Sequence, residues 1–108
     1  MKSKILNFVA EFIGTFIFLG TIITVINSKE STMNFLKIGL ALIVSIAFFG
    51  GVSGGAFNPA VSLLLYLNDK ISLPIMIVQI VAQICGALLA IFVFNNVTSK
   101  GSNMINVH

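Results

Sequence analysis

Residues 53–61, SGGAFNPAV, interrupt a chain that is otherwise strongly apolar. Glycine and proline are the poorest helix formers, and hydrocarbon offers no water to backbone groups that leave a helix. An unbroken helix over residues 35–67 would be about 50 Å long, whereas the hydrocarbon layer of a bilayer is about 30 Å thick. The interruption therefore predicts that one helix ends near residue 52 and that a shorter helix begins at residue 59.

The shorter helix, residues 59–67, would be about 14 Å long and reach roughly halfway through the hydrocarbon layer. Asn58 suits its N-cap and Pro59 its first helical position. At the membrane midplane, the N–H groups of this terminus and the Asn58 amide can donate hydrogen bonds to a neutral solute and oppose cations and protons. The pattern predicts a re-entrant half-helix along a watery cavity. A glycine-rich kink between two buried helices is the simpler alternative.

The composition places the whole chain in a membrane. Of its 108 residues, 57% are hydrophobic, and the mean hydropathy is +1.09. Three apolar stretches, 5–26, 35–52 and 71–94, are long enough to cross a bilayer. The first is too long for the apolar core of a signal peptide and contains Glu11. We predict an integral, multi-pass protein of the cell or inner membrane, surrounded by the lipid bilayer.

The sequence lacks the residues that several classes of function require. The six basic residues are all lysines without a cluster, which excludes nucleic acid as a partner. No nucleophile–base pair, metal-ligand cluster or phosphate loop is present, so we expect no enzyme, no cofactor and no metal. The sole cysteine, Cys85, can form no intrachain disulfide and suits close packing.

Three stretches of the sequence resemble one family. SGGAFNPAV resembles the first NPA loop of the aquaporins and aquaglyceroporins, the major intrinsic proteins; AEFIGTFIFLG (10–20) resembles their first helix and AQICGA (82–87) their third. The resemblance implies an all-α membrane fold of three transmembrane helices plus one re-entrant NPA half-helix, which is half of an aquaporin-like fold. Residues 1–108 would form a single half-repeat, with the re-entrant loop and half-helix at 53–67 and a polar tail at 95–108.

The resemblance also implies roles for individual residues. A carboxylate inside a membrane needs a partner, which the N–H groups of the NPA loop can supply to Glu11. Gln79 and Gln83 are four residues apart and share one helix face. The implied site consists of the NPA motif (Asn58, Pro59, Ala60), pore-lining residues (Gly54, Gly55, Ala56, Val61, Ile38) and loop-bracing residues (Glu11, Gln83, Gln79).

The sequence departs from the family pattern in three respects. It contains one NPA repeat where the family has two inverted repeats, and it has no arginine for the pore filter. Ile38, at another filter position, is aliphatic rather than aromatic, and Ala56 stands where histidine is common. The exposed half-helix end would need a cover, which an antiparallel homodimer could provide. There are two alternatives to this homodimer. A separate partner chain could supply the second half, or the chain could be a truncated copy that no longer conducts.

The lysines favour the antiparallel dimer. In the family's orientation, three lysines face each side: Lys2, Lys4 and Lys70 on one, and Lys29, Lys37 and Lys100 on the other. A chain without an excess of positive charge on one side has little to fix its orientation and can insert both ways.

These observations predict a passive channel for water or small neutral solutes, formed by two half-aquaporin subunits in opposite orientations. A proton-coupled small exporter that uses Glu11, similar to the small multidrug-resistance proteins, is the second hypothesis. A hole-forming or purely structural membrane peptide is the third, and it would not need SGGAFNPAV.

Overall fold

The computed structural model describes residues 3–29 and 32–105, with side chains as far as Asn96. In these residues all regular structure is helical: α1 (Lys4–Ile26), α2 (Asn34–Ser53), α3 (Pro59–Leu67) and α4 (Leu73–Ile105). The all-α fold with a short helix after the NPA loop is confirmed.

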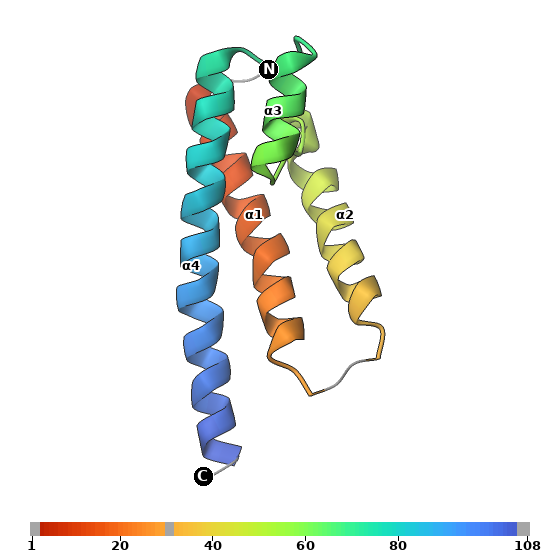
Figure 1. Cartoon of the computed structure of the whole chain (residues 1–108), viewed down its shortest axis with the longest axis vertical. Helices are drawn as coiled ribbons and strands as arrows, with labels where there is room; N and C mark the ends of the chain where they lie inside the picture. Colours follow the sequence, from red (N-terminus) through yellow and green to blue (C-terminus); the bar gives the residue numbers. More distant parts are fainter. Residues whose placement is uncertain (1–2, 30–31, 106–108) are drawn as a thin grey trace.

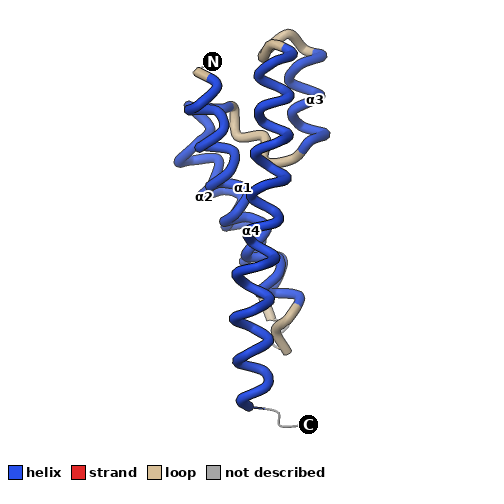
Figure 2. Tube along the Cα trace, turned by 90° about the vertical axis from the view of Figure 1, so that its left-hand side faces the viewer, coloured by secondary structure: helices blue, strands red, loops and turns tan. Residues whose placement is uncertain are grey.

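The molecule is elongated and measures 52 × 24 × 20 Å, and α4, the longest helix, runs along its length (Figure 1). α1 packs against both α2 and α4, and it lies between them in Figure 1. α3 packs against α4 and occupies only the upper half of the bundle (Figure 1). Figure 2 shows the loop that precedes α3 inside the upper half of the bundle, below the level at which α3 ends. The half-helix therefore starts in the interior of the membrane span and ends at one surface.

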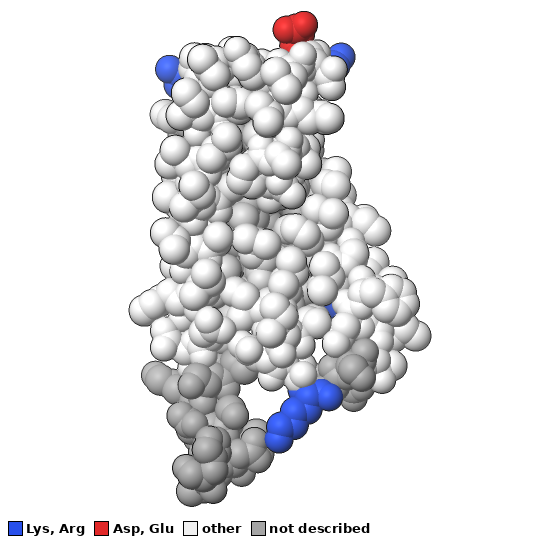
Figure 3. All heavy atoms as spheres, viewed as in Figure 1, with Lys and Arg blue, Asp and Glu red and all other residues white. Residues whose placement is uncertain are grey.

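The surface of the bundle is apolar. Three helical segments are long and apolar enough to cross a membrane, namely Lys4–Ile26, Asn34–Ser53 and Leu73–Asn96. Large apolar side chains such as Phe35, Phe48 and Phe92 point outward, and the visible charged side chains lie toward the two ends of the molecule (Figure 3). Hydrocarbon solvates such a surface and water does not. The chain is an integral, multi-pass membrane protein.

Small residues allow α1 and α4 to approach closely. A Cβ at Gly86 would lie 2.8 Å from the Phe12 carbonyl oxygen, and one at Gly20 would lie 2.5 Å from the Phe94 ring. Ala82 and Ala90, one turn on either side of Gly86, are fully buried. A row of small residues at this spacing is typical of helix contacts within membranes.

The last helix is longer than the sequence analysis predicts. We expected it to end near residue 94, with a polar tail after it, whereas α4 continues to Ile105. The added segment is polar but contains no proline, and only Gly101 is a strong helix breaker there. The apolar part of α4 that can span the membrane still ends at Asn96.

Candidate functional site

The NPA loop reverses the chain through left-handed backbone conformations. α2 closes with a hydrogen bond from the Gly54 N–H to the Gly50 carbonyl oxygen, 2.8 Å long. Gly54 and Gly55 have φ of 89° and 66°, which glycine adopts without cost. Phe57 has φ of 52°, which is unusual for a residue with a side chain. Packing of the Phe57 side chain must therefore offset a backbone cost.

The packing partner of Phe57 is Gly14 on α1. Phe57 is only 3% exposed, and a Cβ at position 14 would overlap its ring. Gly14 thus provides the space in which the ring anchors the loop against α1.

The Glu11 carboxylate lies fully buried beneath the loop and accepts hydrogen bonds from it. Oε1 accepts from the Phe57 N–H at 2.7 Å and from Gln83 Nε2 at 2.9 Å. Oε2 accepts from the Ala56 N–H at 3.1 Å and from the Ser53 hydroxyl at 2.6 Å. Each of these groups is a donor and an ionised carboxylate is purely an acceptor, so the set is complementary. These are the contacts that a loop-bracing residue needs.

A second layer of amides and hydroxyls connects the loop, α3 and α4. Gln79 Nε2 donates to the Ser53 carbonyl oxygen at 2.8 Å and to Asn7 Oδ1 at 3.0 Å. The Ser62 hydroxyl donates to Gln79 Oε1 and accepts from Gln83 Nε2, both at 2.8 Å. All of these side chains are buried, where polar groups need such partners.

Sequence reasoning missed three members of this network: Asn7, Ser53 and Ser62. Asn7 precedes Glu11 by four residues and Ser62 follows Asn58 by four, so each shares a helix face with a residue of the predicted site. That spacing was the available signal. Ser53 directly precedes the two glycines and carried no comparable signal.

The half-helix begins as the sequence predicts. Asn58 is extended, with φ of −159°, and its Oδ1 accepts from the Ala60 N–H at 2.8 Å, while Pro59 occupies the first turn. The three NPA residues are exposed. Because the cap engages Oδ1, the amide Nδ2 is the donor end that Asn58 can present to a solute.

The structure brings Gly54, Gly55, Ala56 and Val61 to this terminus but not Ile38, which lies near the start of α2, at the end of that helix remote from the loop (Figure 1). Gly54 is exposed, Gly55 and Val61 are half-buried, and Ile38 is half-buried on α2. Ala56 is buried, and its N–H is bonded to Glu11, so only its carbonyl group could serve a permeating molecule. The roles of these residues in a pore stay predictions.

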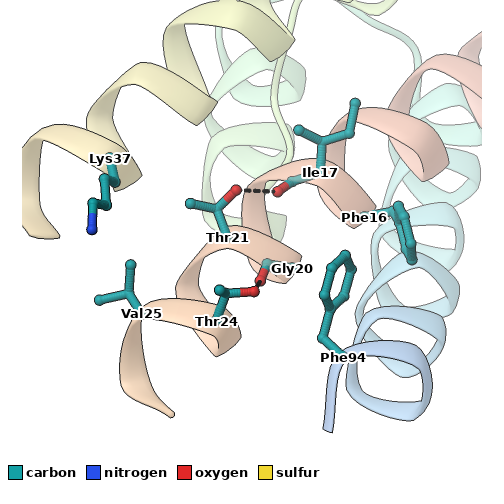
Figure 4. Close-up of a pocket in the computed structure, with 8 residues that line it drawn as sticks. All are labelled: Phe16, Ile17, Gly20, Thr21, Thr24, Val25, Lys37 and Phe94. Carbon is teal, nitrogen blue, oxygen red and sulfur yellow. Dashed lines mark hydrogen bonds between the residues drawn. The ribbon is translucent and has the colours of Figure 1, made fainter. Parts of the chain in front are cut away.

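Two of the cavities in the described residues border α1. One of 130 Å³ adjoins the half-helix and is lined by Thr15, Leu19, Phe57, Pro59, Gln83, Ile84 and Ala87; we call it the half-helix cavity. The other, of 360 Å³, is lined by eight residues of α1, α2 and α4, including Lys37 and Phe94 (Figure 4). In the larger one the Thr21 and Thr24 hydroxyls already donate to carbonyl oxygens of their own helix at 2.9 Å. It contains none of the predicted site residues.

The described part of the chain offers no metal site. In residues 3–29 and 32–105, no group of three His, Cys, Asp or Glu side chains is placed to hold an ion. Its cysteine, Cys85, is a half-buried free thiol on α4.

The fold and the site define a class: a helical membrane protein whose re-entrant half-helix is held by a buried glutamate. Comparison with known proteins points to the same class of membrane protein. The model of the family described as Major intrinsic protein matches residues 1–108. The chain is 46% identical over 86 residues to the glycerol uptake facilitator protein-like 6 of Lactiplantibacillus plantarum, covering 78% of this chain and 40% of that protein. It belongs to the major intrinsic protein family.

More distant relatives come from plants and animals. The chain is 40% identical to the probable aquaporin PIP2-8 of Arabidopsis thaliana, over 77% of this chain and 34% of that one. It is 35% identical to Aquaporin-1 of Homo sapiens, over 85% and 39% respectively. The chain thus spans 34–40% of the length of these three relatives. No solved structure matches it.

Proposed function

We propose that this protein forms a passive channel for water or small neutral solutes, with the exposed N-terminus of α3 at the centre of the pore. The observation that carries the proposal is the position of this terminus. It lies inside the bundle rather than at its upper end (Figure 1). Asn58 is its cap, and Glu11 ties the adjoining loop to α1.

The chemistry of the terminus suits a neutral solute. Asn58 Nδ2 can donate to an oxygen of the permeant, and the positive end of the helix dipole opposes cations and protons. The apolar side chains of Val61, next to the terminus, and of Ile38, at the far end of α2, would form parts of the wall. Relatives named as aquaporins and as a glycerol uptake facilitator support this solute class. With no arginine in the chain and Ile38 at a filter position, we propose that selectivity extends to glycerol- or urea-like molecules.

The pore needs a second wall, and we propose that a second copy in the opposite orientation provides it. Asn58, Pro59 and Ala60 are exposed in a single copy, and polar groups facing hydrocarbon are costly. A two-fold axis in the membrane plane would bring two such termini together.

The charge distribution is compatible with insertion in both directions. Lys4 and Lys70 lie at the end where α1 begins and α3 finishes, and Lys29 and Lys37 lie toward the α1–α2 connection (Figure 1). Such a balance gives little preference for one orientation.

The network around Glu11 argues against the proton-coupled exporter. All four hydrogen bonds to its carboxylate come from protein donors, and the side chain is fully buried. A coupling carboxylate must instead be reached by protons and cargo in turn.

The test is osmotic shrinkage of vesicles that contain the purified protein, with water, glycerol and urea fluxes measured for wild type and Asn58→Asp. Aspartate keeps the cap oxygen but lacks the Nδ2 donors and adds a negative charge, so we expect a several-fold lower water flux. Asn68→Asp, at the other end of the same helix, is the matched control and should behave as wild type. Wild-type flux equal to that of empty vesicles would contradict the channel and favour a non-conducting truncated copy or a missing partner chain.

A further inference from the structure

The 360 Å³ cavity is a groove in the half of the bundle that α3 does not occupy. The last turns of α1 line it, together with one residue of α2 and one of α4. Figure 4 shows Lys37 of α2 on one side of it, Phe16 and Phe94 on the other, and Thr21 and Thr24 between them. Its volume falls in the range of about 300–1,000 Å³ that small-molecule sites occupy. We call this cavity the α1 groove.

The α1 groove suits an apolar ligand along most of its length. The Thr21 and Thr24 hydroxyls already donate to the Ile17 and Gly20 carbonyl oxygens, both at 2.9 Å, and so are not available to a ligand as donors. The Phe16 and Phe94 rings pack together on one side, with 5.4 Å between their centroids. Apart from Lys37, the groove therefore offers hydrocarbon and aromatic surface.

Lys37 brings a positive charge to this apolar groove, and the described residues supply no carboxylate near it. Glu11 lies ten positions before Thr21 on α1, about 15 Å along the helix, and is buried beneath the NPA loop. Asp69 lies in the turn between α3 and α4, at the opposite end of the bundle (Figure 1). The groove thus combines an apolar floor with a cation that an anionic ligand can pair.

We propose that the α1 groove binds an anionic phospholipid, with one acyl chain along α1 and the headgroup phosphate at the Lys37 ammonium group. A lysine ammonium group is a compact point charge with three donors, and it binds phosphate well. Basic pockets between transmembrane helices are known lipid headgroup sites. The inference is independent of the proposed channel, because none of the groove residues belongs to the candidate pore.

The depth of the groove fits one lipid leaflet. Val25 and Phe16, which both line the groove, are nine positions apart on α1 and therefore about 14 Å apart along the helix. That is roughly half of the 30 Å hydrocarbon layer. Lys37 lies in the first turns of α2, where a lysine stem can follow apolar surface while its ammonium group reaches the headgroups. An acyl chain that starts at the headgroup level would thus follow the groove toward the membrane midplane.

The test measures lipid binding to the full chain in bilayers by electron spin resonance. Phosphatidylcholine vesicles that contain the purified protein receive a trace of phosphatidylglycerol or phosphatidylcholine, each spin-labelled on an acyl chain. The spectrum separates lipid that is immobilised on the protein from free lipid, which gives a relative association constant. We expect wild type to prefer phosphatidylglycerol about fivefold and Lys37→Gln to remove this preference.

Lys29→Gln is the matched control. Lys29 is exposed toward the same end of the bundle but does not line the groove. Both variants remove one positive charge from that end, so any effect on orientation in the membrane is shared. We expect Lys29→Gln to keep most of the preference for phosphatidylglycerol.

A second variant fills the groove without changing the charge. Thr24 is exposed and lines the groove, so Thr24→Phe would place a ring where the acyl chain lies. We expect it to lose the preference for phosphatidylglycerol while the helical circular dichroism is retained. Ile43→Phe adds a ring to an exposed position of α2 outside the groove and should bind lipid as wild type does.

Four results would overturn the inference. Equal binding of both lipids by wild type would mean that the groove holds no anionic lipid. An equal loss in Lys29→Gln and Lys37→Gln would show a general attraction to that end of the bundle. A preference that survives Thr24→Phe would place the lipid outside the groove. If Thr24→Phe instead weakened energy transfer between labelled copies and left lipid binding unchanged, the occupant would be a second copy.

Discussion

Glu11 is the residue on which the loop depends most. It joins α1 to the end of α2, to the loop and to α4 through four hydrogen bonds. A charged group in a membrane helix is costly by itself, and here each carboxylate oxygen receives two donors. The residue also separates two hypotheses, because an exporter would need Glu11 to change partners during transport while a passive channel needs it to keep them.

Glu11→Gln tests this difference. Glutamine offers one acceptor oxygen where the carboxylate offers two, and its amide hydrogens would face the Ala56 or Phe57 N–H. We expect the free energy of unfolding to fall by about 2 kcal/mol, measured by thermal unfolding in detergent. Flux per folded protein should not respond to an imposed proton gradient, in wild type or variant. A gradient-dependent wild-type flux that Glu11→Gln abolishes would favour the exporter instead.

At the scale of elements, the half-helix is the part that sequence reasoning located best. Its start follows from Asn58 and Pro59, whose chemistry is local, and the structure begins α3 at Pro59. The end of α4 was misplaced because hydropathy reports where the membrane ends and not where a helix ends. The network around Ser62 was missed because a serine between apolar residues looks like any small packing residue.

The attachment of α3 to α4 depends on Ser62. Ser62→Ala would leave Gln79 Oε1 and one hydrogen of Gln83 Nε2 unpaired in the interior, so we expect a loss of about 1–3 kcal/mol of stability. In Ser62→Ala, the rate of backbone amide hydrogen exchange should rise in residues 59–67 and stay unchanged in α1. Ser45→Ala, which removes one 3.2 Å bond to the Gly14 carbonyl oxygen between α2 and α1, is the control. If the amide exchange rates of residues 59–67 were the same in Ser62→Ala and Ser45→Ala, the role assigned to Ser62 would be contradicted.

At the scale of the whole molecule, one copy leaves the start of the half-helix without a protein neighbour on its outer side. The NPA residues are exposed, and the half-helix cavity lies beside them. The need for a cover could be predicted from the sequence, since one half-helix cannot enclose a pore. The cavity could not, because Thr15 and Gln83 are 68 positions apart and meet only when α1 and α4 pack.

The central claim is that two oppositely inserted copies form the pore, and variants with a fixed orientation test it most directly. Asn68→Lys with Lys29→Gln shifts positive charge to one end of the bundle, and Ser28→Lys with Lys70→Gln shifts it to the other, so each pair should insert in a single and opposite direction. Osmotic permeability would be measured in bacterial inner-membrane vesicles that contain either variant or both. We expect neither variant alone to exceed empty vesicles and the co-expressed pair to restore the wild-type flux. Full flux from one orientation alone would contradict the inverted dimer.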